Sequence, residues 1–218
     1  MKVTHYGHAC VLIDIAGTRL LFDPGTLSTG LDDATDLSAI LLSHGHDDHV
    51  DPELLARLME RNPGAVVYAE PELAADLRHS GVIPATPGTR LDVGGTFVEV
   101  LGGTHAPVFG DFPGTGNVAF LVGDGAFLHP GDSFEVPPGD VAVLALPTSG
   151  PWIKVADAIA YARRVAPSVV VPIHEAALSS TDTVFAMLEG FLPEGTAFVP
   201  PKRGVPIEID GSAGVGRS

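Results

Sequence analysis

Residues 40–49 read Ile-Leu-Leu-Ser-His-Gly-His-Asp-Asp-His, a short apolar run that leads into three histidines and two aspartates. Imidazole and carboxylate groups are ligands that suit zinc, manganese or iron. Side chains two residues apart in an extended chain point the same way, so His44 and His46 can hold one ion. Asp48 and His49 follow where the chain turns, and they can face a second ion. The stretch therefore predicts a metal site and indicates two metals.

The composition of the 218-residue chain is typical of a globular domain with a large apolar core. Hydrophobic residues make up 45% and charged residues 18%, and the mean hydropathy is +0.27. This composition excludes a largely disordered chain, and we expect one domain over residues 1–218, with 211–218 as a flexible tail.

The formal net charge of −15 argues against a nucleic-acid partner, because phosphate backbones require basic surfaces. An acidic surface can equally serve only to keep a protein soluble, and it does not exclude a small anionic substrate at a metal site. We therefore expect a small-molecule substrate and no nucleic acid. The oligomeric state stays open.

The sequence also indicates where in the cell the protein resides. The N-terminal residues enter a strand-like pattern directly and do not resemble a secretory signal. No apolar run reaches the roughly 18 residues that a membrane span requires. The single cysteine, Cys10, excludes an internal disulfide and fits a reducing compartment. We expect a cytoplasmic protein without a membrane partner.

The pattern of apolar residues divides the chain into two similar halves. Each half begins with strands and continues as helix, strand and helix, which is typical of two sheets packed back to back with helices outside. The fold class predicted is α/β, a four-layer α/β/β/α sandwich. The expected strands are 3–6, 9–15, 19–22, 37–42, 66–69, 96–101, 117–122, 126–129, 141–146, 169–172, 197–199 and 205–209, and the expected helices are 51–61, 71–79, 152–165 and 181–191.

Three further candidate ligands each follow a predicted strand: His105, Asp132 and His174. Functional groups gather in loops along one edge of a rigid scaffold. A single histidine after a strand is weak evidence, but together with the cluster at 44–49 the series indicates a metal centre. The irregular stretch 106–116 is either an active-site loop or only a connection.

The complete series, from His44 through His174, resembles the metallo-β-lactamase superfamily over essentially the whole chain. The resemblance implies one ion held by His44, His46 and His105, a second held by Asp48, His49 and His174, and Asp132 bridging both. It also implies that Asp23, in Phe-Asp-Pro-Gly at residues 22–25, braces the metal loop from behind the ligands.

Three shorter motifs narrow the resemblance to compact bacterial metal-dependent hydrolases related to the ascorbate-6-phosphate lactonase. They are Tyr-Gly-His-Ala at 6–9, Gly-Asn at 116–117 and Val-Pro-Ile-His at 171–174. The chain lacks the cysteine ligand of the secreted zinc β-lactamases and the basic arm of the tRNA-processing relatives. It also has a histidine, His46, where the flavin-linked diiron relatives have a glutamate, and nothing in it resembles their flavodoxin domain.

Two metals about 3.5–4 Å apart can share a water and lower its pKa towards 7, which makes a metal-bridging hydroxide the expected nucleophile. Asp48 can orient that hydroxide and carry a proton to the leaving group. His8 is a second catalytic candidate, although a buried structural histidine is an equal alternative. The candidates for substrate contact are Asn117, Trp152 and Lys154.

The remaining histidines have less specific roles. We expect His129 to support the site or end a strand, and His5 and His79 to be structural or exposed. The main hypothesis is a dinuclear hydrolase of a small ester, lactone or phosphoester, with two divalent ions, zinc first and manganese or iron as alternatives. Two other functions stay open: a mononuclear iron oxygenase of the same fold, and a non-catalytic metal-binding or sensor protein.

Overall fold

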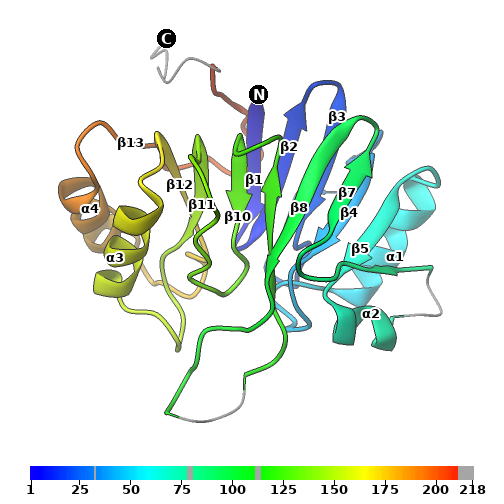
Figure 1. Ribbon diagram of the computed structural model, residues 1–218, viewed down its shortest axis with the longest axis horizontal. Coiled ribbons are helices and arrows are strands. Elements are labelled where there is room, and N and C mark those ends of the chain that lie inside the picture. The colour runs from blue at the N-terminus through cyan, green and yellow to red at the C-terminus, as the bar shows by residue number, and fades with distance from the viewer. Residues whose placement is uncertain (32, 78–80, 111–113, 211–218) are drawn as a thin grey trace.

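The computed structural model describes residues 1–31, 33–77, 81–110 and 114–210. Two seven-stranded sheets pack face to face, with helices on their outer faces (Figure 1). Helices α1 (Pro52–Arg61) and α2 (Pro71–Asp76) lie on the side of the first sheet, and α3 (Val155–Val165) and α4 (Asp182–Phe191) lie on the side of the second. The predicted four-layer α/β/β/α sandwich is confirmed.

The first sheet contains, in spatial order, β14 (Ile207–Glu208), β1 (Lys2–Gly7), β2 (Cys10–Ile15), β3 (Thr18–Phe22), β4 (Ala39–Leu42), β5 (Val66–Ala69) and β6 (Ile83–Pro84). The pairs from β14 to β3 are antiparallel, and those from β3 to β6 are parallel. Parallel neighbours need a crossover connection, which residues 23–38 provide from β3 to β4, α1 from β4 to β5 and α2 from β5 to β6.

The second sheet repeats this plan. Its spatial order is β13 (Ala197–Phe198), β12 (Val169–Ile173), β11 (Val143–Pro147), β10 (Phe127–His129), β9 (Val118–Val122), β8 (Thr96–Gly102) and β7 (Arg90–Val93). The pairs from β7 to β10 are antiparallel and those from β10 to β13 are parallel. The similarity of the two halves that the apolar pattern indicates is therefore present in the sheets.

Alternation along the strands distributes the apolar side chains between three layers. In β2, Val11 and Ile13 face the core between the sheets, whereas Cys10 and Leu12 face α1 and α2. Helix α1 contributes Leu54, Leu55 and Leu58 to this outer layer between the first sheet and its helices. The Asp51 carboxylate caps this helix by accepting hydrogen bonds from the amides of residues 53 and 54, a contribution of about 1 kcal/mol.

The structure corrects several predicted boundaries. Helix α3 begins at Val155 rather than at residue 152, because Trp152 and Ile153 are buried in the outer core and Asp157 caps the helix at Lys154. The short strands β6 and β7 were not predicted, since each has little apolar pattern. His79 and the predicted tail 211–218 lie outside the described residues. Among the described residues, no helix is both long and apolar enough to cross a membrane.

The strand directions bring the candidate site residues to one edge of the sandwich. β1, β3 and β4 share one direction in the first sheet, as do β8, β10 and β12 in the second. The loop after β8 extends beyond the sheets at this edge (Figure 1). Six candidates follow these strands within three residues of their C-terminal ends: His8, Asp23, His44, His105, Asp132 and His174.

Candidate metal centre

The predicted ligands form two adjacent groups. The first cluster consists of His44, His46, His105 and Asp132, and the second consists of His8, Asp48, His49 and His174. Within each cluster, one nitrogen or oxygen atom per residue lies within 4.8 Å of every other. The fold therefore brings together all seven residues of the series that the sequence singles out, and adds His8.

Asp132 lies between the two clusters and turns one oxygen toward each. Its Oδ2 lies 3.3 Å from Nε2 of His105 and 4.0 Å from Nε2 of His44 in the first cluster. Its Oδ1 lies 3.1 Å from Nε2 of His49 and 3.2 Å from Nε2 of His174 in the second. Asp132 is only 2% exposed, so this carboxylate is shared by the clusters and screened from water.

The chemistry of these groups fits metal ions. Four ligand atoms are buried and make no hydrogen bond within the part of the chain that the structure describes: Nε2 of His49, His105 and His174, and Oδ1 of Asp132. A buried polar atom without a partner costs about 1–3 kcal/mol. Four such atoms converging on the same region are the donor set that a divalent cation requires, and nitrogen–oxygen donors suit zinc, manganese or iron.

Asp23 supports both clusters from behind. Its Oδ2 accepts hydrogen bonds from Oγ of Ser43 at 2.6 Å and from Nδ1 of His49 at 2.8 Å, and its Oδ1 accepts from the Ser43 amide at 2.7 Å. Oγ of Ser43 in turn lies 3.0 Å from Nδ1 of His44. One buried carboxylate thus orients a histidine of each cluster, and such contacts fix the tautomer that leaves Nε2 free for a metal.

Ser43 was not predicted as part of this site. Its position directly before the first histidine of the cluster is the only signal in the sequence, and serine there reads equally well as the end of a buried strand.

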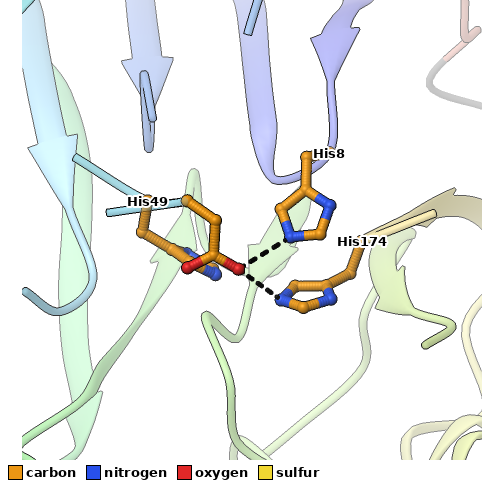
Figure 2. Close-up of side chains that lie close together, drawn as sticks. His8, His49 and His174 are labelled. Carbon is orange, nitrogen blue, oxygen red and sulfur yellow. Dashed lines mark hydrogen bonds and ion pairs between the residues drawn. The ribbon is translucent and has the colours of Figure 1, made fainter. Parts of the chain in front are cut away.

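The second cluster collects side chains from three separate segments. Figure 2 shows the rings of His8, His49 and His174 converging, with dashed lines to a carboxylate. Oδ2 of Asp48 lies 3.0 Å from Nε2 of His8 and 3.6 Å from Nε2 of His174. Burial alone would raise the pKa of Asp48, but the His8 hydrogen bond and the neighbouring His49 and His174 lower it to about 2.

Burial and neighbouring charges shift the pKa values of the histidine ligands in different directions. Burial lowers the pKa of His44 and His46, and the neighbouring histidines reinforce this effect. Burial would also lower the pKa of His49, but Asp132 and Asp23 raise it well above its ordinary value. In the metal-free protein His44 and His46 are thus neutral, while His49 carries a proton between two carboxylates.

Asn117, a predicted substrate contact, lies in the interior beside the loop that carries Asp132. It is fully buried, and its amide holds the loop that carries Asp132: Nδ2 donates to the Pro130 carbonyl at 3.0 Å, and Oδ1 accepts from the Asp132 amide at 2.9 Å. Gly131 permits this packing, since a Cβ there would lie 2.3 Å from Oδ1 of Asn117. Asn117 thus positions Asp132, and its role in substrate contact stays a prediction.

Trp152 lies beside ligands of both clusters. Its ring centroid is 5.7 Å from that of His105 and 5.9 Å from that of His174, and its Nε1 is buried without a hydrogen-bond partner. Lys154, two residues further on, is exposed at the start of α3. The structure thus places Trp152 against the centre, while the role of Lys154 in substrate binding stays a prediction.

Two further histidines are structural supports. His129 is fully buried, stacks on Phe22 and hydrogen-bonds through Nε2 to the Ala9 carbonyl at 2.9 Å, which links the two sheets. His5 is 2% exposed and lies with its Nε2 2.9 Å from the carbonyl oxygen of His8. Neither belongs to a cluster, as the sequence predicts.

Comparison with known proteins agrees with the fold. The family model described as the beta-lactamase superfamily domain matches residues 2–174. Protein Rv0786c of Mycobacterium tuberculosis is 44% identical over 180 residues, which span 81% of this chain and 84% of that protein. A UPF0173 metal-dependent hydrolase of Carboxydothermus hydrogenoformans is 32% identical over 197 residues, which span 80% of this chain and 84% of that protein.

Among solved structures, Igni18, a metallo hydrolase from the archaeon Ignicoccus hospitalis, superposes with a TM-score of 0.74 at 22% identity, over 96% of this chain and 99% of that one. At this identity the likeness concerns the fold. The fold and the site together define a protein of α/β/β/α sandwich architecture with a candidate metal centre. The chain belongs to the beta-lactamase superfamily, and the predicted family resemblance is confirmed.

Proposed function

We propose that this protein is a dinuclear metal-dependent hydrolase of a small ester, lactone or phosphoester. The observation that carries the proposal is the position of Asp132, with one carboxylate oxygen facing each cluster of otherwise unpartnered ligand atoms. The relative from Carboxydothermus hydrogenoformans, named a metal-dependent hydrolase, supports the general reaction class. Two divalent ions held here would lower the pKa of a shared water and polarise the bond under attack.

The protein's own residues define how a substrate reaches this centre. His46 is exposed and the Asp48 side chain is 32% exposed, whereas the other ligands are buried. The open side of the centre therefore lies at these two residues. Asp48, ionised because its pKa is about 2, can accept a proton from water there and pass it to the leaving group.

The substrate class is proposed from the family resemblance and from the net charge. The resemblance to a sugar-phosphate lactonase makes a lactone the first compound class to assay, although fold does not determine substrate. The net charge of −15 favours a small molecule over nucleic acid. Zinc is the first metal proposed, with manganese and iron as alternatives, and a cytoplasmic location remains part of the proposal.

The proposal is tested by hydrolysis assays on lactones, carboxylic esters and phosphodiesters, with protein reconstituted separately with zinc, manganese and iron. We expect turnover of at least one class, and a loss of 100-fold or more in Asp132→Ala and His46→Ala. Occupied metal without turnover across the panel would favour the non-catalytic alternative. Oxygen consumption with one iron per chain would favour the oxygenase.

A further inference from the structure

His8 reaches the second cluster from outside the ligand series. It directly follows β1 and is 1% exposed. Its Nε2 lies 3.0 Å from Oδ2 of Asp48, and its ring centroid lies 3.8 Å from that of His174 (Figure 2). The side chain is therefore fixed against two groups of the second cluster.

The backbone of His8 is held in an unusual conformation. Its φ is +54°, in the left-handed region, which costs about 1–2 kcal/mol for a residue with a Cβ. Three hydrogen bonds fix it there. The His8 amide donates to Oε1 of Glu175 at 3.3 Å, and its carbonyl accepts from the His174 amide and from Nε2 of His5, each at 2.9 Å. Strain maintained by so many contacts points to a functional position.

The hydrogen bonds of its ring distinguish His8 from the metal ligands. In the described ranges, Nε2 of His49, His105 and His174 makes no hydrogen bond and is free for an ion, whereas Nε2 of His8 is already paired with Asp48. Nδ1 of His8 is buried and has no partner among the described residues, so a proton there would be unsatisfied. The proton therefore belongs on Nε2, facing the carboxylate.

We propose that His8 is a positioning residue, which donates its Nε2–H to Oδ2 of Asp48 and so holds this partly exposed carboxylate toward the second cluster. This inference rests on the proposed function, because it concerns the same centre. Without His8, Asp48 would lie at the open side of the centre with freedom to rotate into water. The second ion would then bind more weakly, and the first cluster would be unaffected.

Two amide substitutions test the role of the Nε2 donor. In His8→Gln the side-chain amide can place an N–H near the position of Nε2, whereas in His8→Asn it is one methylene too short. Asparagine also tolerates a positive φ, so this variant retains the backbone. Asp47→Asn, at the exposed neighbouring carboxylate, serves as the matched surface control. Affinities for both ions are measured by competition with a chromophoric chelator, and cobalt-loaded protein is compared by absorption spectroscopy.

We expect His8→Asn to weaken the second ion 10–100-fold, with the first ion unchanged. His8→Gln should recover most of that loss and retain the wild-type cobalt spectrum, and Asp47→Asn should match wild type. Equal losses in both His8 variants with a changed cobalt spectrum would make His8 a ligand and overturn the proposal, as would wild-type affinity in His8→Asn. Two ions bound by the wild-type protein would still uphold the proposed centre in either case, whereas one ion or none would refute both.

Discussion

Oδ2 of Asp23 lies 2.8 Å from Nδ1 of His49, and both side chains are completely buried. The same oxygen accepts a hydrogen bond from Ser43, which contacts His44. Asp23 is thereby connected to one histidine of each cluster, although it is a ligand in neither. This arrangement makes the two clusters interdependent, because a single carboxylate sets the orientation of both rings.

Asp23→Asn should weaken both ions. An amide NH2 cannot accept a hydrogen bond. In the place of Oδ2 it would deprive both His49 and Oγ of Ser43 of their acceptor, and in the place of Oδ1 it would deprive the Ser43 amide of its acceptor. We expect each ion to bind 10–100-fold more weakly in chelator competition. Asp14→Asn, which removes only a partly exposed ion pair with Arg19, is the control. Unchanged affinity in Asp23→Asn would show that the ligands do not depend on this carboxylate.

Metal binding should release a proton from His49. Because Asp132 and Asp23 raise the pKa of His49 above its ordinary value despite burial, the ring is protonated at neutral pH in the metal-free protein. A ligand nitrogen must lose that proton, so about one proton should leave per chain, and affinity should increase with pH until the His49 pKa is passed.

Calorimetric titrations in two buffers of different ionisation enthalpy measure this release. The observed enthalpy should change with the buffer in proportion to the protons released. Enthalpies that are identical in both buffers would contradict the assignment of the proton to His49.

Gly131→Ala should destabilise the protein more than a matched glycine substitution. Gly131 has φ +57°, and a Cβ there would lie 2.7 Å from Cβ of Ser43. Gly17 has φ +83° with no atom within 4 Å of that Cβ, so Gly17→Ala measures the backbone cost alone. Denaturant unfolding should give about 1 kcal/mol for Gly17→Ala and about 3 kcal/mol for Gly131→Ala. Equal losses would indicate that the Asp132 loop can move aside.

Chelation should lower thermal stability and change tryptophan fluorescence together. Ligands that bind only the folded state stabilise it by mass action, by about 2.7 kcal/mol at a concentration 100 times Kd. Trp152, the only tryptophan, contacts His105 and His174 and so reports on both clusters. Readdition of metal should restore Tm and fluorescence with the same stoichiometry. A fluorescence signal insensitive to metal would contradict the position of Trp152.

Much of the fold and the ligand series could be predicted because both depend on local patterns. Strand alternation and the caps of α1 are visible within short stretches, and the histidines at 44–49 form a compact motif. His105, Asp132 and His174 are scattered, but each follows a strand, and strand direction alone brings such positions to one edge.

The contacts of His8, Ser43 and Asn117 could not be predicted, because they depend on packing between distant segments. His8 meets Asp48 across 40 residues, and Asn117 holds a turn 13 residues away. Nothing local distinguishes an asparagine that contacts substrate from one that supports a loop. The burial of Asn117 and its hold on the Asp132 loop are properties of the folded chain.

The most direct test of the dinuclear centre is anomalous diffraction from crystals of the metal-loaded protein, recorded at the absorption edge of the bound metal. Two peaks should lie on opposite sides of the Asp132 carboxylate, about 3.5–4 Å apart. One peak should contact the first cluster and the other the second. A single peak, or peaks away from Asp132, would contradict a centre bridged by this residue.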